Sequence, residues 1–449
     1  MVQRETWATR TGFILAAVGS AVGLGNVWRF PYQVGEFGGA AFLVVYLLLI
    51  AVIGFPIMLV EFTVGRYTDR NPVGALKQIG RGPWKRIGWV FVVAGFVILS
   101  YYSVIAGWVL QYMAYGLQGN YAADGAAQFG STVGGVTPVL THAIFMAAVI
   151  AVVALGIRQG IELSVKLMVP AIIVLSVGLA VYAATLPGAG EAYAYYLSPD
   201  LGTITADWTE ILPAAAGQAF FTLSLGMGVM ITYASYLGED RNLAKDGVII
   251  VGLDTMIAFF MGLIAFPILL SGDVGAADIG TIGDGPGFIF IALSQAFANV
   301  PLGGLLGAVF FATVTVAALS SAISIMEVVV SYLIDEHGVD RVPATVGLGI
   351  AIFLVGVPVA YDASLSWLTV YDELANNILL ILGALLLSIY IGWIKTDLGL
   401  EELSKGIRNL GAWGTYWIWA LRIPVVVMLI VILGLNAVGA YEALSGIVG

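Results

Sequence analysis

The chain has 449 residues, of which 60% are hydrophobic and only 10% are charged, and its mean hydropathy is +0.98. This composition excludes a soluble globular protein, because such a protein needs far more charge to cover its surface. The formal net charge is −10, which fits the acidic loops of a salt-loving host and ordinary variation equally well, and no nucleic-acid partner is expected. There is no cysteine, so disulfides and cysteine-ligated metals are excluded. The chain is predicted to be one all-α integral membrane domain over residues 1–449.

Hydropathy predicts about eleven membrane-spanning helices in chain order. They cover residues 11–35, 39–65, 87–117, 140–157, 163–186, 211–238, 244–271, 303–334, 343–359, 364–394 and 414–438. The first is interpreted as a span and not as a signal peptide, because no small-residue cleavage site follows it.

Basic residues mark one side of the membrane. The segment 66–86 alone holds six Lys or Arg residues, and the other basic residues of the loops fall on the same side as the N-terminus. The opposite loops, at 118–139, 187–210, 272–302 and 360–363, hold none. The positive-inside rule therefore predicts a cytoplasmic N-terminus and, with eleven spans, a C-terminus outside.

Glycines interrupt the first and sixth predicted spans. Residues 19–26 contain three glycines and an asparagine, and residues 222–228 contain two glycines beside Thr222 and Ser224. Each glycine costs about 1 kcal/mol relative to alanine within a helix. One such glycine is well explained by close helix packing. Two clusters with polar neighbours favour discontinuous helices, whose free amides and carbonyls bind ligands in the middle of the membrane.

The residues around these breaks resemble the neurotransmitter:sodium symporter family, especially its bacterial amino-acid carriers. The similar stretches are 4–10, 21–31, 217–226, 231–236 and 319–325, and the likeness continues in order through nearly the whole chain. The resemblance implies a 5+5 inverted-repeat fold with discontinuous first and sixth helices. Residues 1–186 would form the first repeat, 211–394 the second, and 395–449 an additional C-terminal helix.

The resemblance also implies a sodium-coupled symporter with two Na⁺ sites. The first site would use Ala21, Asn26, Thr222 and Asp254, completed by the substrate carboxylate. The second would use Gly19, Val22, Ala317, Ser320 and Ser321. Carbonyls freed by a broken helix and Ser or Thr hydroxyls are the oxygen ligands that a hard cation requires.

The implied substrate is an L-amino acid that is carried into the cell. Its carboxylate would bind the amides of Leu24 and Gly25 and the hydroxyl of Tyr102, and its ammonium would bind near Ser224. The full predicted pocket is Ala21, Leu24, Gly25, Ile98, Tyr102, Phe221, Thr222, Ser224, Met227 and Ile325. Because no member is charged, we expect a hydrophobic or aromatic side chain, with Leu, Met, Phe and Trp as candidates.

Other family positions correspond to gates. Arg29 and Asp372 match an external gate pair, Arg4 and Asp335 match an internal pair, and Tyr236 lies between the internal partners in the family. Glu61 matches a carboxylate that bonds the loosened backbone of the sixth span.

One departure concerns chloride. Many eukaryotic members bind chloride with a serine of the seventh span, where this chain has Ala258, and Asp254 stands where many members have asparagine. A fixed carboxylate would replace the chloride charge, so chloride-independent transport is expected. Asp254 either stays ionised throughout or takes a proton when sodium leaves, which would give proton antiport.

Three other classes of membrane protein share some of these sequence features. An intramembrane hydrolase is excluded, because His142 and His337 both lie far from any serine in the middle of the membrane. A proton-coupled permease would share the broken helices but lack the second sodium site. A receptor would bind its ligand without transporting it. The lipid bilayer is the expected surrounding, and the sequence leaves the oligomeric state open.

Overall fold

The computed structural model describes residues 5–271, 287–407 and 410–436, and all structural statements refer to these residues. They form helices and no strands. In chain order the α-helices are α1 (Arg10–Ala21), α2 (Phe30–Glu36), α3 (Ala40–Leu49), α4 (Phe55–Thr68), α5 (Pro72–Ile79), α6 (Gly88–Gln118), α7 (Gly125–Thr132), α8 (Val136–Ala154), α9 (Leu163–Ala183), α10 (Ala189–Leu197), α11 (Leu201–Ala206), α12 (Trp208–Thr222), α13 (Val229–Ala234), α14 (Leu243–Ser271), α15 (Ser294–Asn299), α16 (Gly303–His337), α17 (Arg341–Tyr361), α18 (Ser366–Asp372), α19 (Ile381–Ile389), α20 (Thr396–Ser404) and α21 (Gly411–Ala420).

The helices account for the predicted spans. Among the described residues, nine continuous helical segments are long and apolar enough to cross a membrane. A tenth is the pair α1 and α2, which is bent by 53° at its break. The sixth predicted span is the pair α12 and α13, separated by the irregular residues 223–228. Several predicted boundaries are off by a few residues, since α8 begins at Val136 rather than at residue 140.

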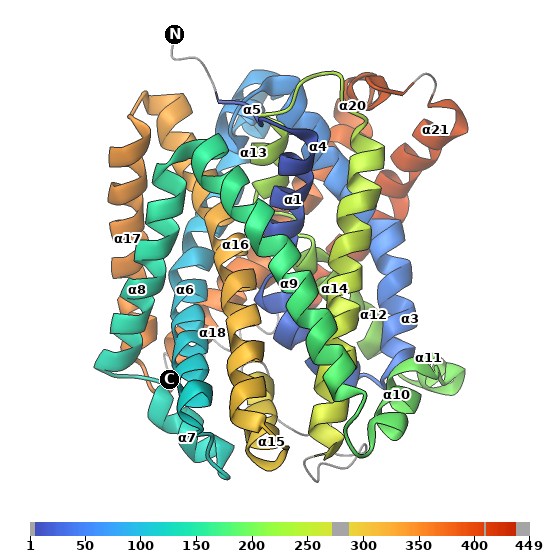
Figure 1. Cartoon of the computed structure of the whole chain (residues 1–449). Helices are drawn as coiled ribbons and strands as arrows, with labels where there is room; N and C mark the ends of the chain where they lie inside the picture. The colour runs from blue at the N-terminus through green and yellow to red at the C-terminus, as the bar shows by residue number, and fades with distance from the viewer. Residues whose placement is uncertain (1–4, 272–286, 408–409, 437–449) are drawn as a thin grey trace, which may run out of the picture.

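Two long helices form the centre of the bundle. α6 and α16 pack against each other along much of their length, and most of their apolar side chains are buried (Figure 1). A helix that is apolar all round buries its whole circumference, which explains why these two lie inside. The broken α1 also packs on α16, so that the break at residues 22–24 faces the core of the bundle.

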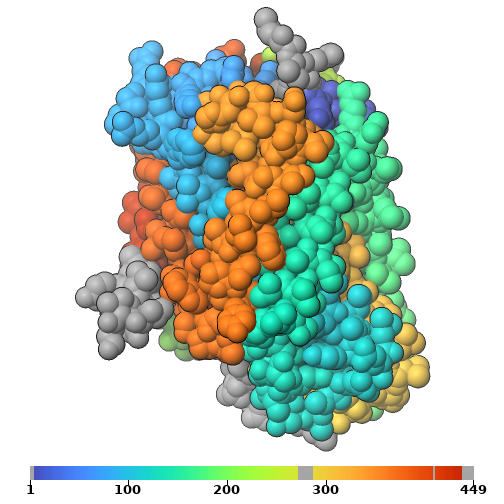
Figure 2. Space-filling view, turned by 90° about the vertical axis from the view of Figure 1, so that its left-hand side faces the viewer, coloured from blue at the N-terminus to red at the C-terminus, as the bar shows by residue number. Residues whose placement is uncertain are grey.

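Peripheral helices face the lipid instead. α17 and α8 run side by side on one face of the molecule (Figure 2). Leu140 and Ile144 of α8 and Ile350 and Leu354 of α17 are all more than half exposed. Such an apolar surface is stable in a bilayer, where lipid chains cover it.

Short helices cap both ends of the bundle. α5 and α20 lie at the end where α1 begins, and α7, α10, α11 and α15 lie at the opposite end (Figure 1). These two ends are called the N-terminal side and the opposite side below.

Candidate functional site

Two backbone amides at the break in the first span donate hydrogen bonds to side chains. α1 ends at Ala21 and is followed by a π-helical turn from Gly25 to Arg29. The amide of Leu24 donates to the Tyr102 hydroxyl at 3.2 Å, and the amide of Gly23 donates to Asn26 Oδ1 at 3.1 Å. These bonds replace the helical partners that the two amides lose at the break.

The sixth span breaks where left-handed backbone occurs. Ser224, Gly226 and Gly228 have φ angles of +52°, +81° and +76°, which an α-helix cannot contain. The amide of Gly226 donates to Glu61 Oε1 at 2.8 Å. Glu61 is fully buried in α4, so it supplies a strong acceptor to an amide that has lost its helical partner.

Three predicted ligands of the first sodium site come together between the breaks. Asn26 Nδ2 donates to Asp254 Oδ1 at 2.8 Å, and Thr222 Oγ1 donates to Asp254 Oδ2 at 2.9 Å. All three side chains are fully buried. Within the described part of the chain, no basic nitrogen lies within 4.0 Å of Asp254. A buried carboxylate without a cationic side chain fits a bound metal cation.

The residues predicted for the second sodium site lie across α1 and α16. A Cβ atom built at Gly19 would come 3.3 Å from Ser320 Cβ, and one at Gly23 would come 3.1 Å from Ser321 Oγ. Ser320 Oγ donates to the Ala317 carbonyl at 2.9 Å, one turn earlier in the same helix. Val22 caps the end of α1, where carbonyls lose their helical partners. Hydroxyls and carbonyls are thus grouped at one helix crossing, and this donor set fits a hard monovalent cation.

A small cavity joins the two breaks. It is lined by Ser20, Ala21, Gly23, Leu24, Gly25, Ile98, Tyr102, Phe221, Ser224, Met227, Ser321 and Ile325. Nine of the ten predicted substrate residues are in this lining, and the exception is Thr222, whose side chain turns to Asp254. Sequence reasoning missed Ser20 in this lining; its position between Gly19 and Ala21 was the available signal.

The predicted external gate pair is not in contact. No nitrogen of Arg29 lies within 4.0 Å of an Asp372 oxygen, although both residues are described. Asp372 Oδ1 instead accepts hydrogen bonds from the Tyr101 hydroxyl at 2.9 Å and from Asn376. The Arg29 guanidinium lies over the Phe221 ring, 5.1 Å from its centroid.

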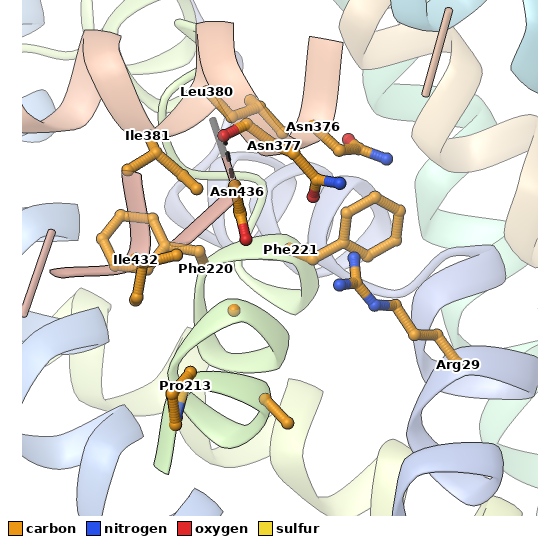
Figure 3. Close-up of a pocket in the computed structure, with 12 residues that line it drawn as sticks. Arg29, Pro213, Phe220, Phe221, Asn376, Asn377, Leu380, Ile381, Ile432 and Asn436 are labelled. Atoms are coloured by element: carbon orange, nitrogen blue, oxygen red, sulfur yellow. Dashed lines mark hydrogen bonds between the residues drawn. The ribbon is translucent and has the colours of Figure 1, made fainter. Parts of the chain in front are cut away.

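A second cavity opens beside this cation. Its volume is about 140 Å³, and its lining includes Arg29 and Phe221 together with Asn376 and Asn377 of the tenth span (Figure 3). Figure 3 also shows Asn436, whose side-chain amide donates to the Asn377 carbonyl at 3.4 Å. Arg29, the predicted external gate residue, therefore lies in the wall of this cavity.

The predicted internal gate is only partly described. Arg4 lies outside the described residues, so its pairing with Asp335 is not observed. Asp335 Oδ2 accepts hydrogen bonds from the backbone and side-chain amides of Asn71 at 3.0 and 3.1 Å.

Tyr236 binds a residue that sequence reasoning left without a role. The Tyr236 hydroxyl donates to Glu327 at 2.7 Å, and Arg341 donates to both oxygens of Glu327. Arg341 also pairs with Glu5 at 3.0 Å, so four segments meet in one network. The missed signal was charge balance, because Glu327 is a carboxylate within a span and therefore needs a partner.

Comparisons with known proteins agree with this architecture. Residues 4–129 and 127–444 match the sodium:neurotransmitter symporter family. The sodium-dependent transporter YhdH of Bacillus subtilis is 35% identical, over 96% of this chain and 97% of its own length. The sodium-dependent dopamine transporter of Bos taurus is 26% identical, over 96% of this chain and 69% of its own length.

A solved structure is similar throughout. The crystal structure of MhsT in complex with L-phenylalanine matches with a TM-score of 0.86 and 39% identity, covering 97% of this chain and 100% of that one. This match confirms the predicted all-α membrane fold. The chain belongs to the sodium:neurotransmitter symporter family and is a sodium-dependent membrane transporter, not an enzyme.

Proposed function

We propose that this protein carries L-amino acids with hydrophobic or aromatic side chains into the cell together with sodium. The observation that carries the proposal is the cavity at the two helix breaks, which combines backbone amides with an uncharged wall. Ile98, Met227 and Ile325 give that wall its apolar character, and a charged side chain buried there would find no partner. The similar structure of MhsT was solved with L-phenylalanine.

The ends of an amino acid find complementary groups in this cavity. Helix N-terminal amides attract anions, so the amides of Leu24 and Gly25 suit the substrate carboxylate, with the Tyr102 hydroxyl opposite them. The Ser224 hydroxyl and the carbonyls near Ala21 suit the ammonium. Phe221 and Met227 then receive the side chain, and Met adapts its shape to substrates of different size.

Two sodium ions complete the proposed complex. One binds between Asn26, Thr222 and Asp254, next to the substrate carboxylate. The other binds at the crossing of α1 and α16, where Ser320 and Ser321 face Gly19 and Gly23. Sodium that binds both helices stabilises their contact, which couples ion binding to the conformation of the transporter.

The direct test is uptake into proteoliposomes. Radiolabelled leucine and tryptophan should accumulate in an inward sodium gradient, and accumulation should stop when potassium replaces sodium. Uptake without sodium would instead favour a proton-coupled permease. Binding that depends on sodium without any uptake would favour a receptor.

Chloride independence is a separate part of the proposal. Asp254 places a fixed negative charge among the sodium ligands, and the seventh span has Ala258 where chloride-binding members have serine. Replacing chloride with gluconate should therefore leave sodium-driven leucine uptake unchanged. Loss of uptake in gluconate would contradict this part alone.

Proton antiport is proposed as the return step for the same carboxylate. Asp254 would take a proton when sodium and substrate leave, because a buried carboxylate without a cation is costly. Uptake should then accelerate when the inside of the vesicle is acidified. Uptake that does not respond to internal pH would leave Asp254 as a permanently ionised sodium ligand.

A further inference from the structure

Three buried serine hydroxyls form a string beside the substrate cavity. Ser20 belongs to the last turn of α1, Ser224 to the sixth-span break, and Ser324 to α16. Ser324 Oγ donates to Ser20 Oγ at 2.7 Å, and Ser20 Oγ donates to Ser224 Oγ at 3.3 Å. Ser224 Oγ donates in turn to the Ser20 carbonyl at 2.9 Å. The string thus joins the two broken helices to the helix of the second sodium site.

Ser20 and Ser224 hold each other in place. The Ser20 carbonyl lies at the end of a broken helix, where the amide four residues later, that of Leu24, bonds to Tyr102 instead. The Ser224 hydroxyl supplies the missing donor, and Ser224 does so with a left-handed φ of +52°. That backbone conformation is energetically costly for a residue other than glycine. The two bonds between Ser20 and Ser224 offset this cost.

The donor-to-acceptor direction of these serine hydrogen bonds determines whether the cavity offers donors or acceptors to a ligand. A serine hydroxyl has one proton and two lone pairs. The Ser224 proton is used on the Ser20 carbonyl, and the Ser20 proton is used on Ser224. Each hydroxyl therefore retains an acceptor lone pair but no free proton, and both residues line the cavity. Ser324 lies behind them, and its proton is shared between Ser20 Oγ and the Ser321 carbonyl at 2.6 Å. Acceptors without donors complement an ammonium, which has three donors and no acceptor.

We propose that Ser20, held by Ser324, is a positioning residue for the substrate ammonium. It fixes Ser224 Oγ as an acceptor at the amine end of the pocket. The pocket would therefore select substrates with a primary α-ammonium over N-methylated amino acids. This inference rests on the proposed amino-acid transport, and it assigns the residues that position the substrate ammonium.

Direct binding to the purified full-length protein tests the proposal. Radiolabelled leucine is titrated in saturating sodium against the wild type, Ser20→Ala and Ser324→Ala. Losing one neutral hydrogen bond predicts about two- to tenfold weaker leucine binding in each variant. Ser331→Ala is the matched control, because Ser331 is also buried in α16 but donates only to the Val328 carbonyl of its own helix. Its leucine affinity should equal that of the wild type.

Two further readouts separate positioning from a general structural effect. In a Ser224→Ala background, Ser20→Ala and Ser324→Ala should cause no additional loss, because their effect acts through Ser224. The preference for leucine over N-methyl-leucine should also shrink in both single variants. Fully additive losses, or an unchanged preference, would overturn the positioning role.

Leucine binding by the wild type distinguishes a failure of the proposed transport function from a failure of the serine assignment. If the wild type binds no hydrophobic amino acid in sodium, the proposed function fails and this inference fails with it. If the wild type binds leucine and both serine variants bind it equally well, only the role of Ser20 and Ser324 is overturned.

Discussion

Asp254 shows how much one residue contributes to the proposed site. Its carboxylate is fully buried and accepts hydrogen bonds from two neutral side chains, those of Asn26 and Thr222. Neutral donors compensate a buried negative charge only in part, so a cation should bind here strongly. The same charge is the basis of the proposal that transport does not need chloride.

We predict that Asp254→Asn weakens sodium binding roughly tenfold or more, because a charge-assisted contact is worth about 1.5–3 kcal/mol. A sodium titration of leucine binding measures this change. Asp246→Asn is the control, since Asp246 is a buried carboxylate of the same helix that pairs with Arg10. Equal sodium affinity in the wild type and Asp254→Asn would remove Asp254 from the site.

At the scale of the element, the sixth-span break depends on glycine where the chain turns left-handed. Gly226 has a φ of +81°, and a Cβ atom there would come 2.1 Å from the Leu380 carbonyl oxygen of the tenth span. A side chain would thus be strained by its own backbone and would collide with a neighbouring one.

Gly226→Ala should therefore abolish leucine binding and lower the melting temperature. Gly252→Ala is the matched control, because nothing lies within 4 Å of a Cβ atom built at Gly252 in α14. That variant should bind like the wild type and melt at the same temperature or slightly higher, since alanine favours a helix over glycine by about 1 kcal/mol. Both quantities follow from one thermal-shift series with and without leucine.

A buried ion pair links α20 to α4 on the N-terminal side of the bundle. Arg66, in the last turn of α4, donates to Glu402 Oε1 at 2.5 Å and to the Arg241 carbonyl at 2.5 Å. The side chains of Arg66 and Glu402 have no exposed surface. Glu402 also pairs with Lys405 at 2.9 Å, so loss of Arg66 leaves this buried carboxylate with one cationic partner instead of two.

Arg66→Met should accordingly destabilise the protein, by less than the roughly 3–5 kcal/mol expected for a fully unpaired buried charge, because Lys405 still pairs with Glu402. The double variant Arg66→Met with Glu402→Leu should recover much of that loss, because it removes both charges. Denaturation monitored by tryptophan fluorescence compares the three proteins. A double variant no more stable than Arg66→Met would show that the pair does not act as a unit.

The neighbouring surface pair predicts a pH dependence. The hydrogen bond from Lys405, at 2.7 Å, lowers the pKa of Glu239, and both residues lie outside the spans. A lowered pKa means that the folded state favours the charged carboxylate. The pair therefore adds stability above the ordinary pKa of glutamate and loses it as the pH falls through the lowered value.

The melting-temperature difference between the wild type and Glu239→Gln should be small at pH 7, because the carboxylate is exposed. That difference should disappear as the pH drops below about 4. A difference that stays constant across this range would assign the effect to packing.

At the scale of the whole molecule, the distribution of basic residues predicts the orientation in the membrane. Because the chain has no cysteine, any introduced cysteine is unique. Asp240, in the loop between the sixth and seventh spans, and Ser198, on the opposite side, are both exposed. Ser198→Cys should react with an impermeant maleimide on intact cells, and Asp240→Cys should react only after permeabilisation. The reverse pattern would invert the predicted topology.

Local sequence features determined much of this architecture. Bilayer thickness imposes a minimum length on each apolar segment, so the spans could be read directly from hydropathy. Glycines and polar residues within the first and sixth spans marked both breaks, because backbone inside a membrane has few alternatives to a helix. Family likeness then grouped Asn26, Thr222 and Asp254, and the structure places their side chains within hydrogen-bond distance.

Only the tertiary structure decided which distant side chains meet. Arg66 and Glu402 are 336 residues apart, and Ser20 and Ser324 are 304 apart, yet each pair is in direct contact. Arg29 and Asp372 matched a family pair, but Tyr101, Asn376 and Phe221 provide their partners in this conformation. Hydropathy and glycine content are local properties, and each segment responds to the bilayer according to its own composition. Hydrogen bonds require donor and acceptor atoms to be placed to within a few tenths of an ångström, and those positions are set by the packing of the whole bundle.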